Sequence, residues 1–422
     1  MELHVIIDNL PLQEIPYRSG MDISAVATDE PGRVKSAAEG MDAEKHAAGG
    51  MALCNEHGLC LHFALDGKNY LVDTGASGKA LDNMDTLHRN GNSVPQAEKI
   101  DAVFISHGHN DHTGGLRKFI EQNSTAPIYL HNSIRGNYFF SSRPKNGVRE
   151  ARSIGMEQAL FAEHQERFLE IEGATRITEK ITLIPVTGTK GYAAPMGNEF
   201  LFKNDFPDNF AHEVAILVEH APGKYTVISP CTHNGILNVL ECCTRYLSAP
   251  SCAENGEWCQ NGHFSAPNDA QNEKWCKNGH FSAPSCAENE EWCQNGYFSE
   301  PSYGKNRAAD GATVGATGET AGGATVGATG EAGGGAAGEV LSGRGEIRYF
   351  VGGLHYVDYL QGCGENKEAA QIIGTANKLK ELYPGLKVFS GHCTCSAAGE
   401  LLGSVLGDNY ATFCTGSTIM CK

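Results

Sequence analysis

The sequence lacks three features that would place the protein in well-known classes. No apolar run approaches the ~20 residues of a membrane-spanning helix, so no membrane association is expected. Lys and Arg number 33 against 50 Asp and Glu, and the formal net charge of -17 provides no positive field to attract nucleic acid. Residues 1–8 lack the basic segment and cleavage site of a secretory leader. We therefore expect a cytoplasmic protein that does not bind nucleic acid.

The 15 cysteines are an odd number, so they cannot all pair within one chain. Without a secretory leader, most are expected to be reduced thiols, small buried residues or metal ligands, and a disulfide framework is not expected. Cys242-Cys243 and Cys393-Thr394-Cys395 are too close in sequence to interpret from spacing. We assign no redox role to either group.

At 422 residues with 41% hydrophobic content, the chain is long enough for a large core interrupted by loops. Residues 10–53 show little periodicity and predict a long loop. Residues 249–343 contain three near-copies of a unit at constant spacing, around Trp258, Trp275 and Trp292, followed by Gly/Ala-rich sequence. Such a segment cannot bury enough apolar surface to order itself. We predict a core in two parts, 1–248 and 344–422, separated by a low-complexity insertion over 249–343.

One motif carries most of the chemistry. The apolar run 102–105 predicts a buried strand, and His107, His109, Asp111 and His112 follow it within six residues. These side chains are the types that bind zinc or a similar divalent ion. The alternative, a set of loop histidines on a polar surface, is disfavoured by this spacing and by the glycines at 108, 114 and 115.

Two later histidines repeat the arrangement of an apolar strand, a histidine and a helix. His233 follows the strand predicted at 224–229, and His392 follows the apolar run 387–390. Ligands of an α/β sheet gather outside the carboxyl ends of its strands, so both are candidate metal ligands. Asp73, at the end of the strand predicted at 70–72, is placed either to orient a ligating histidine or simply to form a turn.

Residues 135–152 interleave basic and aromatic side chains, which is unusual in so acidic a chain. Arg143 and Arg149 could hold an anionic substrate by charge-assisted hydrogen bonds, although a solvated loop with ordinary salt bridges is the alternative. His355 lies in a Gly-rich turn after the strand predicted at 347–351, and we place it in the same substrate-binding set.

The motif His-x-His-x-Asp-His after an apolar strand resembles the signature of the metallo-β-lactamase fold. Motifs at 8–9, 56–59, 73–75, 231–236, 352–355 and 391–394 also occur in the order of one branch, the 7,8-dihydropterin-6-methyl-4-(β-D-ribofuranosyl)-aminobenzene-5′-phosphate synthase-like proteins. The resemblance implies an α/β fold, a four-layered αβ/βα sandwich with metals at one edge between two sheets.

The resemblance also implies a ligand set. One ion would be held by His107, His109 and His233, and a second by Asp111, His112 and His392, with Asp111 and His233 acting in catalysis. One or two divalent ions are expected, zinc first, with Mn²⁺ or Fe²⁺ as alternatives. Many members have a bridging Asp where this chain has Ser229-Pro230-Cys231, so either Cys231 or no protein ligand bridges. Cys393-Thr394-Cys395 likewise departs from the Cys-Thr-Gly of the family.

These observations favour a metal-dependent enzyme acting on a phosphorylated or diphosphorylated small molecule, either as a pterin-related synthase-type transferase or as a hydrolase of another ester or phosphoester. A nuclease is disfavoured by the acidic balance. A non-catalytic metal-binding or interaction protein is disfavoured because a structural site is closed by four ligands and does not need six. The sequence does not indicate an oligomeric state.

Overall fold

The computed structural model describes residues 1–9, 23–25, 52–144, 150–187, 191–249, 345–357 and 365–422. Its contacts divide the chain into one unit of Met1–Asn272 and Ser342–Lys422 and another of Glu273–Leu341. Every described residue belongs to the first unit. The predicted insertion lies outside the described residues except for Ala249, as do Arg149 and most of the loop predicted over 10–53.

The first sheet has eight strands in the order β2-β19-β1-β3-β4-β5-β6-β9. They are β1 (Glu2–Ile7), β2 (Ile23–Ala25), β3 (Cys60–Leu65), β4 (Lys68–Val72), β5 (Ala102–Phe104), β6 (Ile128–His131), β9 (Phe168–Ile171) and β19 (Ser417–Met420). β3 and β4 form an antiparallel hairpin, whereas β4, β5, β6 and β9 run parallel. β2 lies in the region where the sequence predicted only a loop, so that prediction was wrong for Ile23–Ala25.

The second sheet has seven strands in the order β10-β11-β14-β15-β16-β17-β18. They are β10 (Thr175–Arg176), β11 (Ile181–Pro185), β14 (Val214–Ala221), β15 (Lys224–Cys231), β16 (Glu346–Gly353), β17 (Lys387–Ser390) and β18 (Tyr410–Thr412). β15 to β18 are parallel neighbours, so their carboxyl ends share one edge. A small third sheet contains β7 (Phe139–Ser141), β8 (Arg152–Ser153), β12 (Leu201–Lys203) and β13 (Phe206–Pro207).

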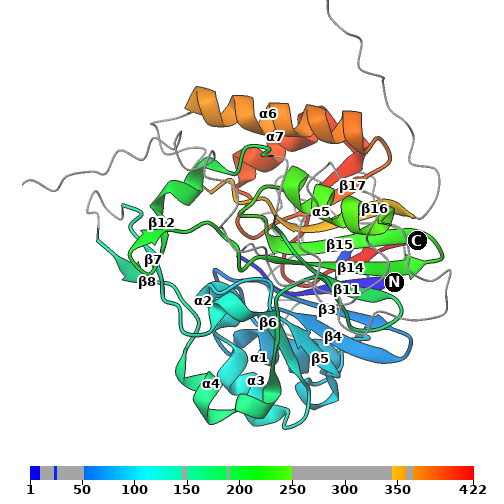
Figure 1. The fold of residues 1–422 in the computed structure, drawn as a ribbon. Helices are drawn as coiled ribbons and strands as arrows, with labels where there is room; N and C mark the ends of the chain where they lie inside the picture. Colours follow the sequence, from blue (N-terminus) through cyan, green and yellow to red (C-terminus); the bar gives the residue numbers. More distant parts are fainter. Residues whose placement is uncertain (10–22, 26–51, 145–149, 188–190, 250–344, 358–364) are drawn as a thin grey trace, which may run out of the picture. The chain divides into compact units, whose positions relative to one another are not determined.

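Helices cover the outer faces of the two large sheets (Figure 1). Those beside the first sheet are α1 (Lys79–Arg89), α2 (Asn110–Thr113), α3 (Leu116–Gln122) and α4 (Ala159–Glu163). Those beside the second are α5 (Ile236–Ser248), α6 (Glu365–Leu382) and α7 (Ser396–Leu406). Short 3₁₀ helices span Ala97–Lys99, Asn132–Ile134, Gln165–Arg167, Met196–Phe200 and Gly407–Asn409.

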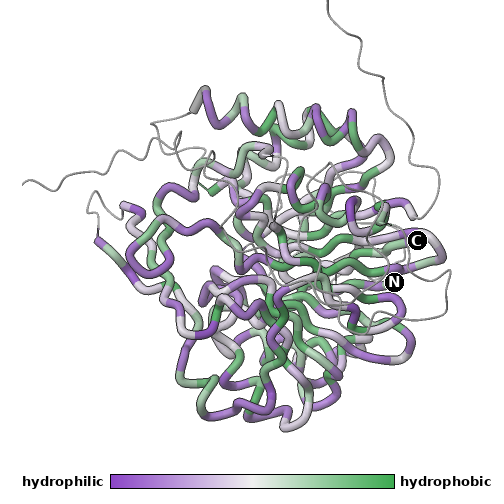
Figure 2. Tube along the Cα trace, viewed as in Figure 1, coloured by the Kyte–Doolittle hydropathy of each residue, from purple (hydrophilic) through white to green (hydrophobic). Residues whose placement is uncertain are grey.

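Apolar side chains fill the three interfaces between these layers, and Figure 2 shows the hydrophobic segments running through the interior. Phe63 and Phe104 of the first sheet pack with Ile216 and Val351 of the second. The helical layers pack through further sets: Leu81, Met84 and Phe119 on one side, and Leu240, Ile372 and Leu402 on the other. The four-layered αβ/βα sandwich implied by the resemblance is confirmed. No helix among the described residues is long and apolar enough to cross a bilayer.

Candidate metal centre

The predicted ligands meet where strand ends of both sheets converge. His107 and His109 follow β5, while Asp111 and His112 lie on α2. From the second sheet, His233 follows β15 and His392 follows β17, whose carboxyl ends lie on one edge because the strands are parallel. Side chains distant in sequence therefore reach one place between the sheets.

Glycines allow the loop between β5 and α3 to pack tightly against the end of β4. A side chain at Gly114 would overlap the carbonyl of Ala76, and one at Gly115 would overlap the carbonyl of Thr74. The Thr74 N–H donates to the carbonyl of His112 over 2.7 Å. The backbone of α2 is therefore fixed directly beneath the candidate ligands.

Three histidines form the first donor group. His107 Nε2 lies 3.1 Å from His109 Nδ1 and 3.2 Å from His233 Nε2. Burial, followed by the neighbouring histidines, lowers the pKa of His107 and His233 well below the usual value, and burial lowers the pKa of His109 to about 3. The three rings are therefore neutral near pH 7, the protonation state that a metal ligand requires.

Asp111 is the centre of the second group. Its Oδ2 lies 3.6 Å from His112 Nε2 and 3.4 Å from His392 Nε2. Both nitrogens are buried, and neither has a hydrogen-bond partner among the described residues. Burial alone would raise the pKa of Asp111, but His112 and His392 hold it well below the usual value. A partly buried carboxylate beside two unsatisfied, buried ring nitrogens fits a divalent cation.

Asp73 connects the two groups. Its carboxylate accepts hydrogen bonds from His112 Nδ1 at 2.6 Å, Ser106 Oγ at 2.6 Å and the Ser106 N–H at 2.8 Å. Because Ser106 Oγ donates to Asp73, it accepts from His107 Nδ1, which lies 2.9 Å away. These bonds place the ring protons of His107 and His112 on Nδ1, which leaves each Nε2 with a lone pair for an ion.

Asn9 and Asn198 orient the ligand candidates of the second sheet. Asn9 Oδ1 lies 3.2 Å from His392 Nδ1, and its amide donates to the His392 carbonyl over 2.9 Å. Asn198 makes the same pair of contacts with His233, at 3.1 and 2.7 Å. In both rings Nδ1 is engaged by an amide oxygen, so Nε2 faces the centre.

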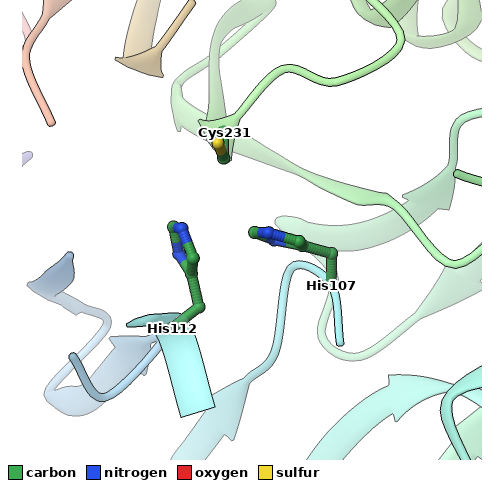
Figure 3. Close-up of side chains that lie close together, drawn as sticks. All are labelled: His107, His112 and Cys231. Carbon is green, nitrogen blue, oxygen red and sulfur yellow. The ribbon is translucent and has the colours of Figure 1, made fainter. Parts of the chain in front are cut away.

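Cys231 lies between the two groups (Figure 3). Its Sγ and the ligand nitrogens of His107 and His112, one from each group, all lie within 4.8 Å of one another. On its other side, Sγ is 3.1 Å from Cys393 Sγ and 3.3 Å from His355 Nδ1. Burial raises the pKa of the Cys231 thiol well above its usual value. The pKa of Cys393 is lowered, because contacts with Cys231 and two histidines outweigh burial.

The residues predicted to bind substrate fall in different places. The Arg143 guanidinium lies 5.5 Å from the Phe200 ring and donates to the Gly197 carbonyl over 3.0 Å. Burial lowers the pKa of Arg143, while the charges of Glu368, Cys231 and Cys393 act in the opposite direction, so this cation lies within electrostatic range of the centre. His355 is buried, with its ring 4.1 Å from that of His233. It is thus part of the donor cluster itself.

Besides Asn198, sequence reasoning missed three further side chains around this centre, His212, Asp208 and His57. His212 Nδ1 accepts from the Gly108 N–H over 3.1 Å, and its Nε2 lies 2.9 Å from Asp208 Oδ2. The pair therefore supports the turn between His107 and His109 through the Gly108 N–H. His57 lies at the open side, 3.6 Å from Asp111, with 68% of its side chain exposed. Only His57 belonged to a motif that could have indicated it.

Comparison with known proteins supports the fold. Residues 58–189 match the family model of the metallo-beta-lactamase superfamily. The crystal structure of Tm1679, described as a metal-dependent hydrolase of the beta-lactamase superfamily, is similar over 100% of this chain and 99% of its own, with a TM-score of 0.51 and 17% identity.

Weaker similarities extend over less than half of this chain. An N-acyl homoserine lactone hydrolase shares 14% identity over 44% of this chain and 74% of its own, with a TM-score of 0.26. A flavoprotein from Thermotoga maritima shares 15% identity over 41% and 32%, with a TM-score of 0.24. No curated protein matches the chain.

Proposed function

We propose that this chain, which has the metallo-β-lactamase fold, is a metal-dependent enzyme with two adjacent ion sites. One observation carries the proposal: two groups of three donor side chains meet at one edge between the sheets. The first is formed by His107, His109 and His233, and the second by Asp111, His112 and His392. Three unshared protein ligands per ion leave positions for a ligand shared by the two ions and for substrate, as catalytic sites do.

The donor chemistry favours zinc. Neutral imidazole nitrogens and a carboxylate suit Zn²⁺, and also Mn²⁺ or Fe²⁺, whereas the thiol of Cys231 is a soft donor that favours zinc among these ions. Cys231 is within reach of His107 and His112, so we propose that its sulfur is the ligand shared by the two sites. It would thereby take the place of the bridging carboxylate found in many similar proteins.

The proposed substrate is a phosphorylated or diphosphorylated small molecule. Arg143 is a half-buried cation that would hold a phosphate group by charge-assisted hydrogen bonds. Bound ions would polarise a phosphoryl oxygen and stabilise negative charge on the departing group. Asp111 and His233 are the proposed catalytic residues, because each presents a donor atom at the centre of its group.

Transfer and hydrolysis remain two versions of this proposal. The motif order supports a synthase-type transferase that displaces pyrophosphate from a pterin methyl diphosphate. The similarity to a metal-dependent hydrolase supports hydrolysis of an ester or phosphoester instead. Both require open ion sites, whereas a non-catalytic metal protein does not.

The test combines metal analysis with a substrate screen. His107→Ala and His109→Ala should each lower bound divalent metal and activity together, with the exposed His88→Ala as the matched control. Purified protein is assayed on phosphate monoesters, phosphodiesters, nucleotides and pterin diphosphates. Metal content equal to wild type in both ligand variants would sink the proposal.

A further inference from the structure

Two thiols face one another beside the proposed ion sites. Cys231, at the end of β15, and Cys393, just after β17, have sulfur atoms 3.1 Å apart, and both side chains are almost fully buried. β16 runs between these two strands and contributes Gly353 at this level. A Cβ atom at Gly353 would overlap Cys393 Sγ, so the missing side chain provides the space in which the thiols meet.

We infer that Cys231 and Cys393 are a reversible disulfide pair that closes when no ion occupies the centre. A disulfide needs an S–S distance of about 2.05 Å, so the sulfurs must approach by roughly 1 Å. Cys242 and Cys243 are a second buried thiol pair, but they occupy consecutive positions of one helix, and such side chains do not face each other. Cys231 and Cys393 therefore have the better geometry for a disulfide.

His355 contacts both sulfurs. Its backbone N–H donates to Cys393 Sγ over 3.2 Å, and its Nδ1 lies 3.3 Å from Cys231 Sγ. His355 adopts a φ of +53°, which is uncommon for a residue with a side chain and directs both groups to the same side. These contacts fix the two sulfurs in mutual reach before any oxidation.

The oxidant required is a small peroxide. In the first step Cys393 sulfur attacks the O–O bond of hydrogen peroxide, which gives a sulfenic acid and one water. In the second step Cys231 sulfur attacks the sulfenyl sulfur, the S–O bond breaks, and the thiol proton leaves with hydroxide as a second water. Two thiols and one peroxide thus give one disulfide and two waters. A dithiol reductant reverses the bond by exchange.

Closure and ion binding should exclude one another, a part of the inference that rests on the proposed function. Cys231 Sγ is within reach of donors from both groups, and a disulfide sulfur has no negative charge to offer an ion. Conversely, a sulfur bound to an ion is not free to attack. By linkage, each state disfavours the other.

The test uses full-length protein freed of metal by chelation and then exposed to hydrogen peroxide. Remaining thiols are alkylated, the protein is digested, and the peptide pair joining Cys231 to Cys393 is quantified by mass spectrometry. We expect this cross-linked pair in wild type and in the buried-thiol control Cys414→Ser, its loss in Cys393→Ser, and full reversal by dithiothreitol. Zn²⁺ added before peroxide should slow its formation at least ten-fold.

The possible outcomes separate the inference from the proposed function. If wild type gives sulfinic or sulfonic acids at both positions without a cross-linked pair, the disulfide assignment is wrong. If zinc analysis shows bound ion and cross-linking is still as fast as in metal-free protein, Cys231 is not a ligand and the mutual exclusion fails. A cross-link in a protein that binds neither Zn²⁺ nor Mn²⁺ nor Fe²⁺ would support the disulfide and contradict the proposed metal enzyme.

Discussion

Replacing Asp73 with Asn tests whether one buried carboxylate organises both ion sites. The change keeps the shape of the side chain but removes its negative charge and one acceptor oxygen. Asp73 accepts three hydrogen bonds of 2.6 to 2.8 Å and has no exposed surface, so no water can replace the lost acceptor. The new amide N–H₂ takes the place of one oxygen: at Oδ1 it faces the Ser106 N–H, and at Oδ2 it faces both His112 Nδ1 and the Ser106 hydroxyl. Either orientation breaks at least one of these hydrogen bonds or reverses a ring tautomer.

The expected magnitude follows from these contacts. Loss of a carboxylate that orients a ligating histidine typically weakens metal binding by about 10- to 100-fold, or about 1.4 to 2.8 kcal/mol. Because Asp73 also reaches His107 through Ser106, both sites should weaken. Weaker zinc binding at both sites would distinguish the proposed network from a contact of Asp73 with His112 alone, which would weaken binding at one site only.

The assay is a competition titration of zinc against a chromophoric chelator, with circular dichroism to verify folding. Asp66→Asn is a matched control, since Asp66 also has a positive φ, +51° against +60° for Asp73, but lies at the surface beside Lys180. Asn tolerates that backbone conformation, so backbone strain is the same in both variants. Unchanged zinc affinity in a folded Asp73→Asn protein would refute the reasoning.

Three further predictions follow from other parts of the structure. Arg143→Ala should weaken apparent affinity for a diphosphorylated substrate by about ten-fold or more, and for a monophosphorylated one by less, at unchanged metal content. Arg348→Ala, at an exposed ion pair, should change neither affinity. Equal kinetics of the two variants would show that Arg143 does not bind the substrate. Replacing 249–343 by a short Gly/Ser linker should preserve soluble, metal-binding protein. The last turn of α5 and the start of β16 both lie beside Tyr225, so a short linker can join the two ends. An aggregated or metal-free product would show that the insertion is structural. In metal-free protein the charges of Cys393 and Asp111 outweigh burial and raise the pKa of His392 to about 9, so its contribution to stability is complete below pH 6.5 and is lost as the pH rises through about 9. Denaturant unfolding from pH 6 to 9.5 should show this loss in wild type but not in His392→Gln. The same dependence of unfolding free energy on pH in both proteins would contradict the prediction.

Most of the sandwich was readable from local sequence because its strands are covered on both faces. β5 is a short apolar run of buried residues, and β6 is apolar up to His131, with only Tyr129 half-buried. Apolar continuity is the signal that such strands leave in the sequence. The end of α6 is likewise local, because the helix stops at Leu382 just before Pro384-Gly385, a pair that typically follows a helix. β2 was missed because its three residues pair with β19, at the opposite end of the chain, and three residues carry no period.

The groups that orient the ligand candidates were less predictable. Asn198 belongs to a 3₁₀ helix and Asp208 to a loop, and neither segment has a periodic pattern. The positions of Asn198 and Asp208 depend on how the neighbouring strands β12 and β14 pack in the fold, which local sequence does not indicate. Asp73 was the exception, because a carboxylate at the end of a recognisable strand can be placed at a sheet edge from sequence alone.

The thiol pair shows why spacing in sequence could not replace sheet order. Cys231 and Cys393 are 162 positions apart in sequence, yet their sulfur atoms lie 3.1 Å from one another. Their proximity requires that β15 and β17 flank β16 in parallel, and that the register place Gly353 opposite Cys231. The same register brings His355 against His233, so a residue assigned to substrate binding lies among the donors. A side chain at Gly353 should therefore separate the sulfurs and disturb this donor cluster together.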